Sequence, residues 1–381
     1  MSILTIIAGS NTSEVFTLQF DTEAKTLVKS SSVTVGNKPS WVTAHPRNKS
    51  VVFTALKIKG GRLIALEFDD NGNGKVLANI STKGDAPSSL IAGTKDVIVG
   101  NVSNTFSYNP ISADVDKYDD ATIFTVPILE QAPFIDVDSA SSQVLQLDGN
   151  GPHPTRQTSS HPHQVLLNGL EGDIFVPDLG ADKTWRLFRK DSRSNYELSD
   201  SVFSSPPGSG PRHAAFYGNY IYVLHELRNI LSSFDLRAHS AAISYSLPST
   251  VLFSEAVKTP DAVTAGEILI PQPNSSFPVP YIYVSNRYDD RSDGGDTIGI
   301  FRIADVETGK FEYVTEVETD FKQLRAMEFI GADGRWLIAG GVFKGGVKVF
   351  ERTNEGKDLK LVAETEDGEL PCSFVELVSR R

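Results

Sequence analysis

The sequence predicts an all-β fold, namely a seven-bladed β-propeller made of four-stranded antiparallel blades. A short phrase, in which a proline and a polar residue precede an apolar run, recurs along the chain at steps of about fifty residues. Repeats of this period are typical of propellers and other repeat folds. No stretch shows sustained helical periodicity, and strand-length apolar runs alternate with turn residues instead.

The repeated phrase occurs seven times and gives the number of blades. Its copies begin at Pro39, Pro87, Pro162, Pro211, Pro260, Leu324 and Pro371. The steps from Pro87 to Pro162 and from Pro260 to Leu324 are longer than the others, which indicates insertions between strands. Seven sheets around a common axis make a seven-bladed ring.

One copy of the repeat shows the strands of a blade. The apolar run Ala214–Tyr217 is followed by the turn Gly218-Asn219, then by the runs Tyr220–Leu224 and Arg228–Phe234. The inner runs are rich in Val, Ile, Phe and Tyr, which suit strands that are buried on both faces. We therefore predict that each unit is a four-stranded meander.

The two ends of the chain predict how the ring closes. The first apolar run, Leu4–Gly9, has no phrase before it, and the last phrase, Pro371–Val378, has no second strand after it. We expect the C-terminal strand to complete the N-terminal blade, which removes two open sheet edges. Residues 1–381 are then a single propeller domain.

Composition limits the partners of this domain. Its formal net charge is −12, and the acidic residues are scattered through turns, which argues against nucleic acid or an anionic membrane as a partner. The single cysteine, Cys372, excludes an internal disulfide framework and a cysteine-based zinc cluster. The first residues lack the features of a signal peptide, so we expect a cytoplasmic protein; the five Asn-X-Ser/Thr matches leave secretion as the alternative.

Polar residues at matching repeat positions predict a pocket at one mouth of the central channel. The phrase marks the start of the innermost strand, so the residue after each proline lies near this mouth: Ser40, Ser88, His163, Arg212, Asp261, Arg325 and Cys372. The second strand of each blade ends beside it, at Ser10-Asn11, Leu56-Lys57, Asn101, Pro177-Asp178, His225-Glu226, Asn286-Arg287 and Gly340-Gly341. Taken singly, each polar residue is better explained as part of a salt bridge or as a turn cap. Together they indicate a ligand pocket.

The residue types of this mouth predict a small anionic ligand. Several arginines around one cavity suit recognition of a carboxylate or phosphate, and a guanidinium can also stabilise an oxyanion or an enolate. Glu226 and His163 supply the titratable pair that general acid–base catalysis needs. The side chains expected to contact the substrate are His161, Asp178, Arg325, Ser40, Ser88 and His225. We expect no metal and no cofactor, since no third ligand follows His161 and His163 at a suggestive spacing.

Several motifs at these positions resemble those of a known family. They are Gly151-Pro152-His153-Pro154-Thr155-Arg156-Gln157, Ser160-His161-Pro162-His163-Gln164-Val165, Gly208-Ser209-Gly210-Pro211-Arg212-His213, Tyr222-Val223-Leu224-His225-Glu226-Leu227 and Ser285-Asn286-Arg287. Taken jointly, they resemble the seven-bladed β-propeller lactonase family, which includes bacterial 6-phosphogluconolactonases and the fungal 3-carboxy-cis,cis-muconate lactonising enzyme.

The resemblance implies an active site and a class of reaction. It places the catalytic residues on His163, Arg212, Glu226 and Arg287, and it implies a lactone hydrolase or a muconate-type cycloisomerase. A different cyclase, isomerase or dehydratase built on the same residues is an alternative, because one fold hosts several chemistries. A non-catalytic propeller that binds a partner on its ring face is a second alternative.

Two segments depart from the family pattern. The acidic run Tyr288–Asp296 is expected to repel a phosphate and so to disfavour a 6-phosphosugar lactone. Its aspartates, Asp289, Asp290, Asp293 and Asp296, are read as a solvated turn, with a calcium site as the alternative. The long insert Tyr108–Leu147 contains apolar clusters that either roof the pocket or form an extra hairpin on the outer rim.

Overall fold

The computed structural model describes most of the chain, and within the described ranges the regular secondary structure is almost entirely β-strand. These ranges are 3–102, 121–138, 141–169, 172–190, 195–200, 202–237, 245–247, 263–287, 294–365 and 370–377. A single 3-10 turn, η1 (Asn354–Gly356), is the only helical element in them. The predicted all-β fold is confirmed.

The strands form seven blades, and the strands of each blade follow one another from the channel outward. The first blade contains β28 (Pro371–Leu377), β1 (Ile3–Ser10), β2 (Glu14–Asp21) and β3 (Thr26–Thr34). The second contains β4 (Pro39–Ala44), β5 (Val51–Leu56), β6 (Arg62–Phe68) and β7 (Gly74–Ser81). The third contains β8 (Pro87–Ala92), β9 (Asp96–Asn101), β10 (Thr122–Pro127) and β11 (Gln143–Gln146).

The fourth and fifth blades follow the same order. The fourth contains β12 (Leu166–Leu167), β13 (Ile174–Asp178), β14 (Lys183–Arg189) and β15 (Tyr196–Leu198), and β16 (Phe203–Ser204) also pairs with β14. The fifth contains β17 (Pro211–Tyr217), β18 (Tyr220–His225), β19 (Ile230–Asp235) and β20 (Tyr245–Leu247). The strands β17, β18 and β19 match the runs that the sequence predicts for this unit.

The last two blades are joined by one long strand. They contain β21 (Thr264–Leu269), β22 (Tyr281–Arg287), β23 (Asp296–Asp305), β24 (Lys310–Ile330), β25 (Trp336–Lys344), β26 (Val347–Thr353) and β27 (Asp358–Glu364). The first part of β24 pairs with β23 as the outer strand of the sixth blade, and its second part pairs with β25 as the inner strand of the seventh. The connected strands therefore count as one seven-stranded sheet but supply two blades.

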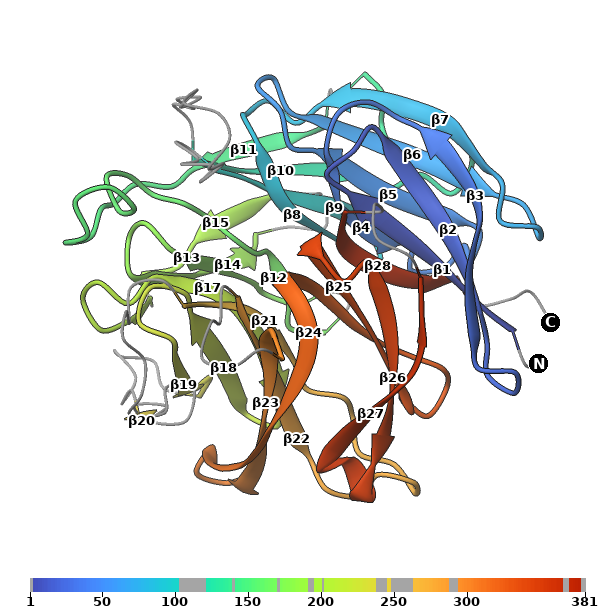
Figure 1. The fold of residues 1–381 in the computed structure, drawn as a ribbon. Coiled ribbons are helices and arrows are strands. Elements are labelled where there is room, and N and C mark those ends of the chain that lie inside the picture. The colour runs from blue at the N-terminus through green and yellow to red at the C-terminus, as the bar shows by residue number, and fades with distance from the viewer. Residues whose placement is uncertain are drawn as a thin grey trace.

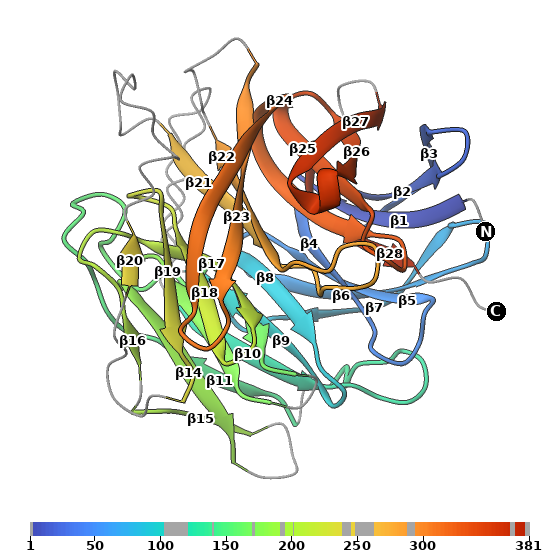
Figure 2. The same cartoon turned by 90° about the horizontal axis from the view of Figure 1, so that it is seen from below.

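The ring closes as the ends of the chain predict. Strand β28 pairs antiparallel with β1, with Val375 opposite Ile7, so the C-terminal strand is the inner strand of the N-terminal blade. In Figure 1 the colours pass in order round the molecule until red meets blue, and the two termini lie close together. Figure 2 shows the termini at one edge of the molecule as well.

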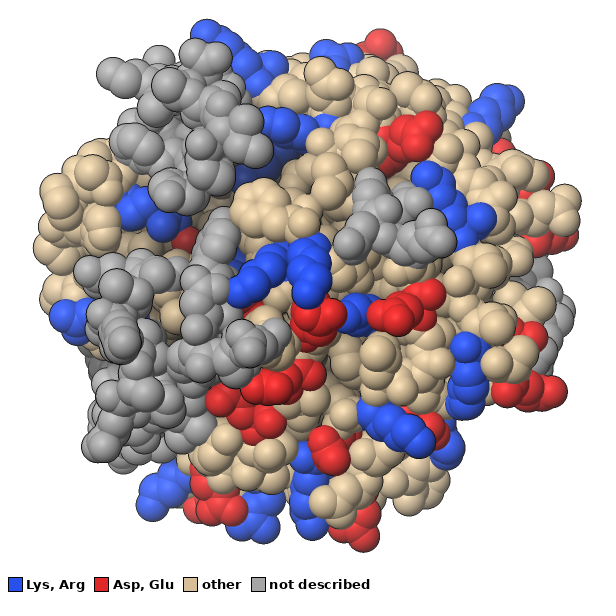
Figure 3. All heavy atoms as spheres, viewed as in Figure 1, with Lys and Arg blue, Asp and Glu red and all other residues tan. Residues whose placement is uncertain are grey.

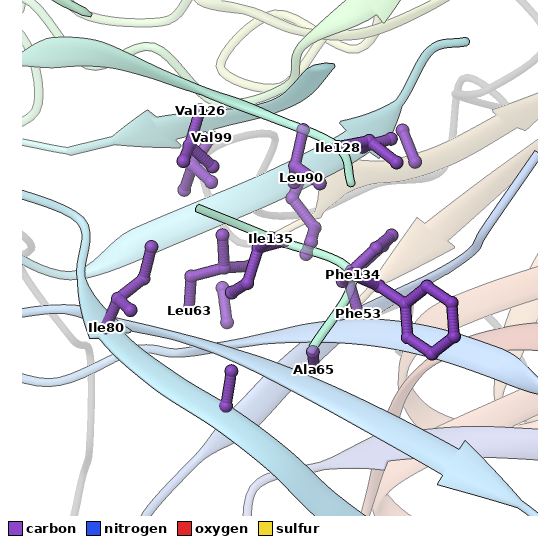
Figure 4. Close-up of a cluster of buried hydrophobic side chains, with 14 of the residues drawn as sticks. Phe53, Leu63, Ala65, Ile80, Leu90, Val99, Val126, Ile128, Phe134 and Ile135 are labelled. Atoms are coloured by element: carbon purple, nitrogen blue, oxygen red, sulfur yellow. The ribbon is translucent and has the colours of Figure 1, made fainter. Parts of the chain in front are cut away.

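The core lies between neighbouring blades, as the packing between the second and third shows (Figure 4). Phe53, Leu63 and Ala65 of the second blade meet Leu90, Val99 and Val126 of the third. Ile128, Phe134 and Ile135 pack into the same cluster, and Ile128 and Ile135 form an antiparallel bridge.

This packing corrects the interpretation of the insert Tyr108–Leu147. Its apolar run Phe124–Pro127 lies within β10, a strand of the blade itself, and the apolar residues after it are buried between two blades. The described part of the insert therefore neither roofs a pocket nor forms a hairpin on the outer rim. Burial between two blades removes more apolar surface from water than either of those two positions would. Residues 103–120 lie outside the described ranges.

Candidate active site

The register of the strands brings the predicted mouth residues to one end of the channel. In each blade a residue near the start of the inner strand lies opposite a residue at or near the end of the second strand. The seven pairs are Ser10–Pro371, Pro39–Leu56, Pro87–Asn101, Pro162–Asp178, Pro211–His225, Thr264–Arg287 and Leu324–Gly341. Residues far apart in the chain therefore share one mouth, as the repeat predicts.

A β-bulge follows this first pair in most blades and explains why the next residue can face the channel. The register shifts by one residue immediately after Pro39, Pro87, Pro211, Leu324 and Pro371. The unpaired residues are Ser40, Ser88, Arg212, Arg325 and Cys372. An extra residue of this kind leaves the hydrogen-bond ladder and has its side chain re-aimed. In the sixth blade the inner strand is described from Thr264 onward, and the predicted start, Pro260-Asp261, lies outside the described residues.

Glu226 directly follows β18 at the mouth and is held by three arginines. Its Oε2 atom is 2.8 Å from Nε of Arg212 and 2.9 Å from Nη2 of Arg287, and its Oε1 atom accepts a hydrogen bond from Arg156. Only 4% of Glu226 and 1% of Arg212 is exposed. Arg156 belongs to one of the sequence motifs, but the repeat did not assign it to the site, because its loop lies between blades and outside the repeat pattern.

The charges of this cluster determine the protonation state of Glu226. Burial opposes ionisation, but Arg287, Arg156 and Arg212 outweigh it and hold the pKa of the Glu226 carboxyl well below its usual value. A carboxylate held in this way exchanges no proton near neutral pH. The predicted acid–base role does not suit this geometry, whereas a role in orienting the arginines does.

Arg212 is anchored by hydrogen bonds on two of its three nitrogens. Its Nη1 atom donates to the Gly266 carbonyl at 2.6 Å and to Nε2 of His213 at 2.8 Å, while Nε donates to Glu226. No side chain or carbonyl among the described residues accepts from Nη2. Burial, together with Arg287, lowers the pKa of Arg212 to about 9, so it is still a cation at neutral pH. Its third nitrogen is thus available to a ligand.

His163 lies next to this cluster and is half-buried. Its Nδ1 atom is 3.2 Å from Nε2 of His213, and its backbone N–H donates to the Pro177 carbonyl. Burial, followed by the charge of Arg212, lowers the pKa of His163 well below its usual value. The imidazole is therefore neutral at physiological pH and able to accept a proton.

Two further cations of the mouth have no counter-ion within the described ranges. Arg325 and Lys57 are both half-buried, and the side chain of neither forms a hydrogen bond or an ion pair with these residues. Burial, followed by Arg325 and Arg212, lowers the pKa of Lys57 to about 7. Together with Arg156, Arg212 and Arg287, they give the mouth more cations than carboxylates. An anionic ligand would therefore be stabilised there.

Lys57 also connects the arginine cluster to a neighbouring cavity. This cavity has a volume of about 420 Å³, and its lining is polar and basic: Asn11, Thr12, Ser13, Asn37, Lys38, Lys57, Ile58 and Lys59. On the face that Figure 3 shows, basic and acidic side chains are intermixed, so an excess of one sign is not general on that face.

Several residues that we predicted to contact substrate are instead used within the protein. Asp178 is completely buried, where it accepts hydrogen bonds from Ser160, the backbone N–H of His161 and Trp185. His225 is also completely buried, between the hydroxyls of Ser209 and Ser232. Asp178 is held in place because it closes the turn after β13, where it also accepts the backbone N–H groups of Gly180 and Ala181. His225 is held in place because both of its ring nitrogens lie against buried hydroxyls.

The remaining predicted contacts differ in their freedom. Ser88 donates to the Pro162 carbonyl at 2.7 Å, and His161 is buried with its Nε2 atom 3.4 Å from the Ser159 hydroxyl. The buried hydroxyl of Ser40 has no hydrogen-bond partner in the described part of the chain, which leaves it open to a ligand or a water. Among these residues, Ser40 is therefore the one whose side chain is most available for the predicted contact with the substrate.

Three other expectations concern a metal ion, the acidic run and a membrane. Within the described residues, no group of three His, Cys, Asp or Glu side chains is placed to hold a metal ion. Most of the acidic run Tyr288–Asp296 lies outside these residues; Asp296 itself is buried and accepts the backbone N–H of Leu324. In the described ranges there is no helix with the length and apolar character needed to cross a membrane.

Comparisons with known proteins agree with the fold. A family described as "Lactonase, 7-bladed beta-propeller" matches residues 5–375. A protein of Arthroderma benhamiae named "Probable 6-phosphogluconolactonase" is 24% identical over 349 residues, which cover 90% of this chain and 80% of the relative. The 6-phosphogluconolactonase of Formosa agariphila is 26% identical over 284 residues, 71% of this chain and 74% of its own. The solved periplasmic gluconolactonase of Pseudomonas aeruginosa superposes with a TM-score of 0.80 at 21% identity, over 99% of each chain.

Proposed function

The chain belongs to the seven-bladed β-propeller lactonase family, and from this premise we propose that it hydrolyses a small lactone that carries an anionic group. The observation that supports this most directly is the cation-rich mouth. There Arg325 and Lys57 lack a counter-ion within the described residues, and the neutral imidazole of His163 lies beside Arg212. Such a mouth suits a substrate with a negative group and a reaction that develops negative charge on oxygen.

His163 and the arginines have different roles in the proposed hydrolysis. The imidazole of His163 accepts a proton from water as the water oxygen attacks the carbonyl carbon of the lactone. The carbonyl oxygen becomes an oxyanion, which Nη2 of Arg212 stabilises by a charge-assisted hydrogen bond. The ring carbon–oxygen bond then breaks, and the leaving oxygen takes the proton from His163. One water is consumed and one hydroxy acid is formed.

The other charged residues of the mouth prepare this arrangement. Glu226 holds Arg156, Arg212 and Arg287 in place through its two oxygens, so their positive charges do not move apart. Arg325 and Lys57 bind the anionic group of the substrate at a distance from the reacting carbonyl. Preorganised charges of this kind lower the barrier because they do not reorganise during the reaction.

The names of two relatives suggest the first substrate to test, which is a 6-phosphorylated gluconolactone. The acidic run that we expected to repel phosphate is described only from residue 294, and there Asp296 is turned into the protein. A panel should contain this compound, the unphosphorylated aldonolactone and an aromatic lactone with a carboxylate.

The test compares acid release from each lactone with spontaneous hydrolysis in the same buffer. We expect the anionic lactones to be hydrolysed faster than in buffer, and His163→Gln to lower kcat by about a hundredfold. Arg302→Met is the matched control because Arg302 is exposed on β23 and paired with Glu312, far from the charges of the mouth. Hydrolysis no faster than in buffer for every lactone, or full activity in folded His163→Gln, would refute the proposal.

A further inference from the structure

A buried chain of three side chains leads away from the mouth, and the proposed hydrolysis does not use its inner members. His163 is followed by His213, whose Nδ1 atom is 2.6 Å from Oε1 of Glu267. Only 1% of His213 and 6% of Glu267 is exposed, in contrast to the half-buried His163. The three residues come from three successive blades, the fourth, fifth and sixth.

The strands position these two inner residues by the same rule that positions Arg212. His213 follows the bulged Arg212 and is the next residue of β17 to pair, opposite Leu224 of β18. Glu267 lies in the corresponding irregular stretch of β21, between Ala265 and Ile268, and its backbone N–H donates to the Ser285 hydroxyl at 2.8 Å. His213 is therefore one step farther along its inner strand than Arg212, and Glu267 lies within the irregular stretch of the next inner strand.

The hydrogen bonds allow only one tautomer of His213. Arg212 has donors alone, so Nε2 of His213, which lies 2.8 Å from Nη1 of Arg212, must be an acceptor. The proton of His213 is then on Nδ1, where the Glu267 carboxylate accepts it. Burial and Arg212 lower the pKa of His213 to about 4, so the ring stays neutral and does not become a second donor toward His163.

The tautomer of His213 determines that of His163. The Nδ1 atom of His163 faces the accepting Nε2 of His213 at 3.2 Å, so the stable arrangement has the proton of His163 on Nδ1. The Nε2 atom of His163 then carries the lone pair, and no described residue donates to it. This nitrogen is the one that can accept a proton from water.

We infer that His213 and Glu267 are positioning residues that hold His163 in the Nδ1–H tautomer, with Nε2 as the basic atom in the mouth. The inference rests on the proposed function, because it assumes that His163 acts as a base. It goes further by naming the reactive nitrogen and the residues that select it. A rival explanation is that His213 only fills space between Arg212 and Trp41, whose ring lies edge to face with that of His213 at 5.5 Å.

The first experiment reads the tautomer directly and needs no substrate. The ring nitrogens of the protein labelled with ¹⁵N histidine are observed by two-bond ¹H–¹⁵N correlation at neutral pH, and His163→Gln and His213→Gln assign the two rings among the seven histidines. We expect protonated Nδ1 and unprotonated Nε2 in both His163 and His213. A His163 ring that carries its proton on Nε2 would overturn the inference, whether or not the protein hydrolyses lactones.

The second experiment separates positioning from packing. In His213→Gln an amide oxygen can take the place of the Nε2 acceptor, whereas His213→Leu fills similar space without any acceptor. We expect His213→Leu to lower kcat at least tenfold with KM changed less than threefold, and His213→Gln to recover most of kcat. Glu267→Leu should lower kcat in the same way, because it removes the acceptor of the His213 proton.

Three results would overturn the inference in this second experiment. Equal loss of kcat in His213→Leu and His213→Gln would assign a packing role, as would a loss that appears only in thermal stability. Undiminished kcat in a folded His213→Leu would show that His163 needs no partner. If no lactone is a substrate, the proposed function fails, and the tautomer of His163 still tests the positioning role.

Discussion

The Nε atom of Arg212 lies 2.8 Å from Oε2 of Glu226, and both side chains are almost completely buried at the mouth of the channel. Arg212 lies in the first strand of one blade and Glu226 directly follows the second, yet Arg156 and Arg287 reach the same carboxylate from other parts of the ring. Breaking a buried ion pair by removing one partner is strongly unfavourable, because the other charge is left without compensation. The site and the stability of the ring are therefore linked through Glu226.

Replacing Glu226 should damage both properties. Glu226→Gln removes the negative charge that Arg156, Arg212 and Arg287 share, so we expect the free energy of unfolding to fall by about 3 to 5 kcal/mol. The arginines would also lose their common anchor, and kcat should fall by at least about a hundredfold. Urea unfolding and initial rates on one preparation measure both effects. A stable variant with normal kcat would show that Glu226 does not organise the site.

Arg325 should act on substrate binding and not on stability. Because Arg325 has no counter-ion in the described part of the chain, Arg325→Met should leave the free energy of unfolding nearly unchanged. For an anionic lactone we expect KM to rise about tenfold or more, which corresponds to the loss of one hydrogen bond between charged groups. KM for an uncharged lactone should not change. An equal rise for both substrates would argue against a contact with the anionic group.

Lys57 should take up a proton when an anion binds. Its pKa of about 7 leaves the amine partly neutral at pH 7 to 8, and a nearby negative charge would raise that pKa. Calorimetric titration with the product hydroxy acid, in buffers of different ionisation enthalpy, should therefore show proton uptake at pH 8. Lys57→Met should abolish the uptake, and Lys59→Met should not. Identical uptake in wild type and Lys57→Met would exclude this role.

The acid limb of the rate profile should lie at unusually low pH. Activity requires neutral His163, and burial beside Arg212 lowers the pKa of this ring well below 6.5. The value of kcat/KM should therefore not decline as the pH falls through 6.5, and should decline only well below it. A decline centred at pH 6.5 or above would show that another group titrates or that His163 is not the base.

Low pH should also destabilise the fold, because two histidines are buried in their neutral form. Burial lowers the pKa of His225 to about 3, and burial with Arg212 lowers that of His213 to about 4, whereas both rise to about 6.5 on unfolding. Below pH 6.5 the unfolded chain binds more protons, so stability falls as the pH decreases. Each ring contributes roughly 3 kcal/mol of this loss between pH 7 and 4. Urea unfolding at several pH values measures how steeply the free energy of unfolding falls with decreasing pH. His225→Gln should make this fall less steep. A free energy of unfolding that does not change between pH 7 and 4 would contradict this account.

Sequence alone determined the architecture because the repeat is local. The recurring phrase, from Pro39 to Pro371, fixed the number of blades, and the incomplete repeats at the two ends indicated that β28 completes the blade of β1. Matching repeat positions also placed Arg212, Arg325 and the end of β22 at a common mouth. These inferences hold because the strand period and the repeat length together decide which end of a blade a residue occupies.

The tertiary structure decided what each of these side chains does. It shows that Glu226 forms ion pairs with three arginines. It also shows that Asp178 and His225 form hydrogen bonds with other residues of the protein. It also adds Arg156 from a loop between blades, and it places His213 and Glu267 behind His163. A sequence pattern fixes the end of a strand at which a residue lies. The direction of its hydrogen bonds and the charges around it depend on neighbours from other blades, which only the closed ring brings together.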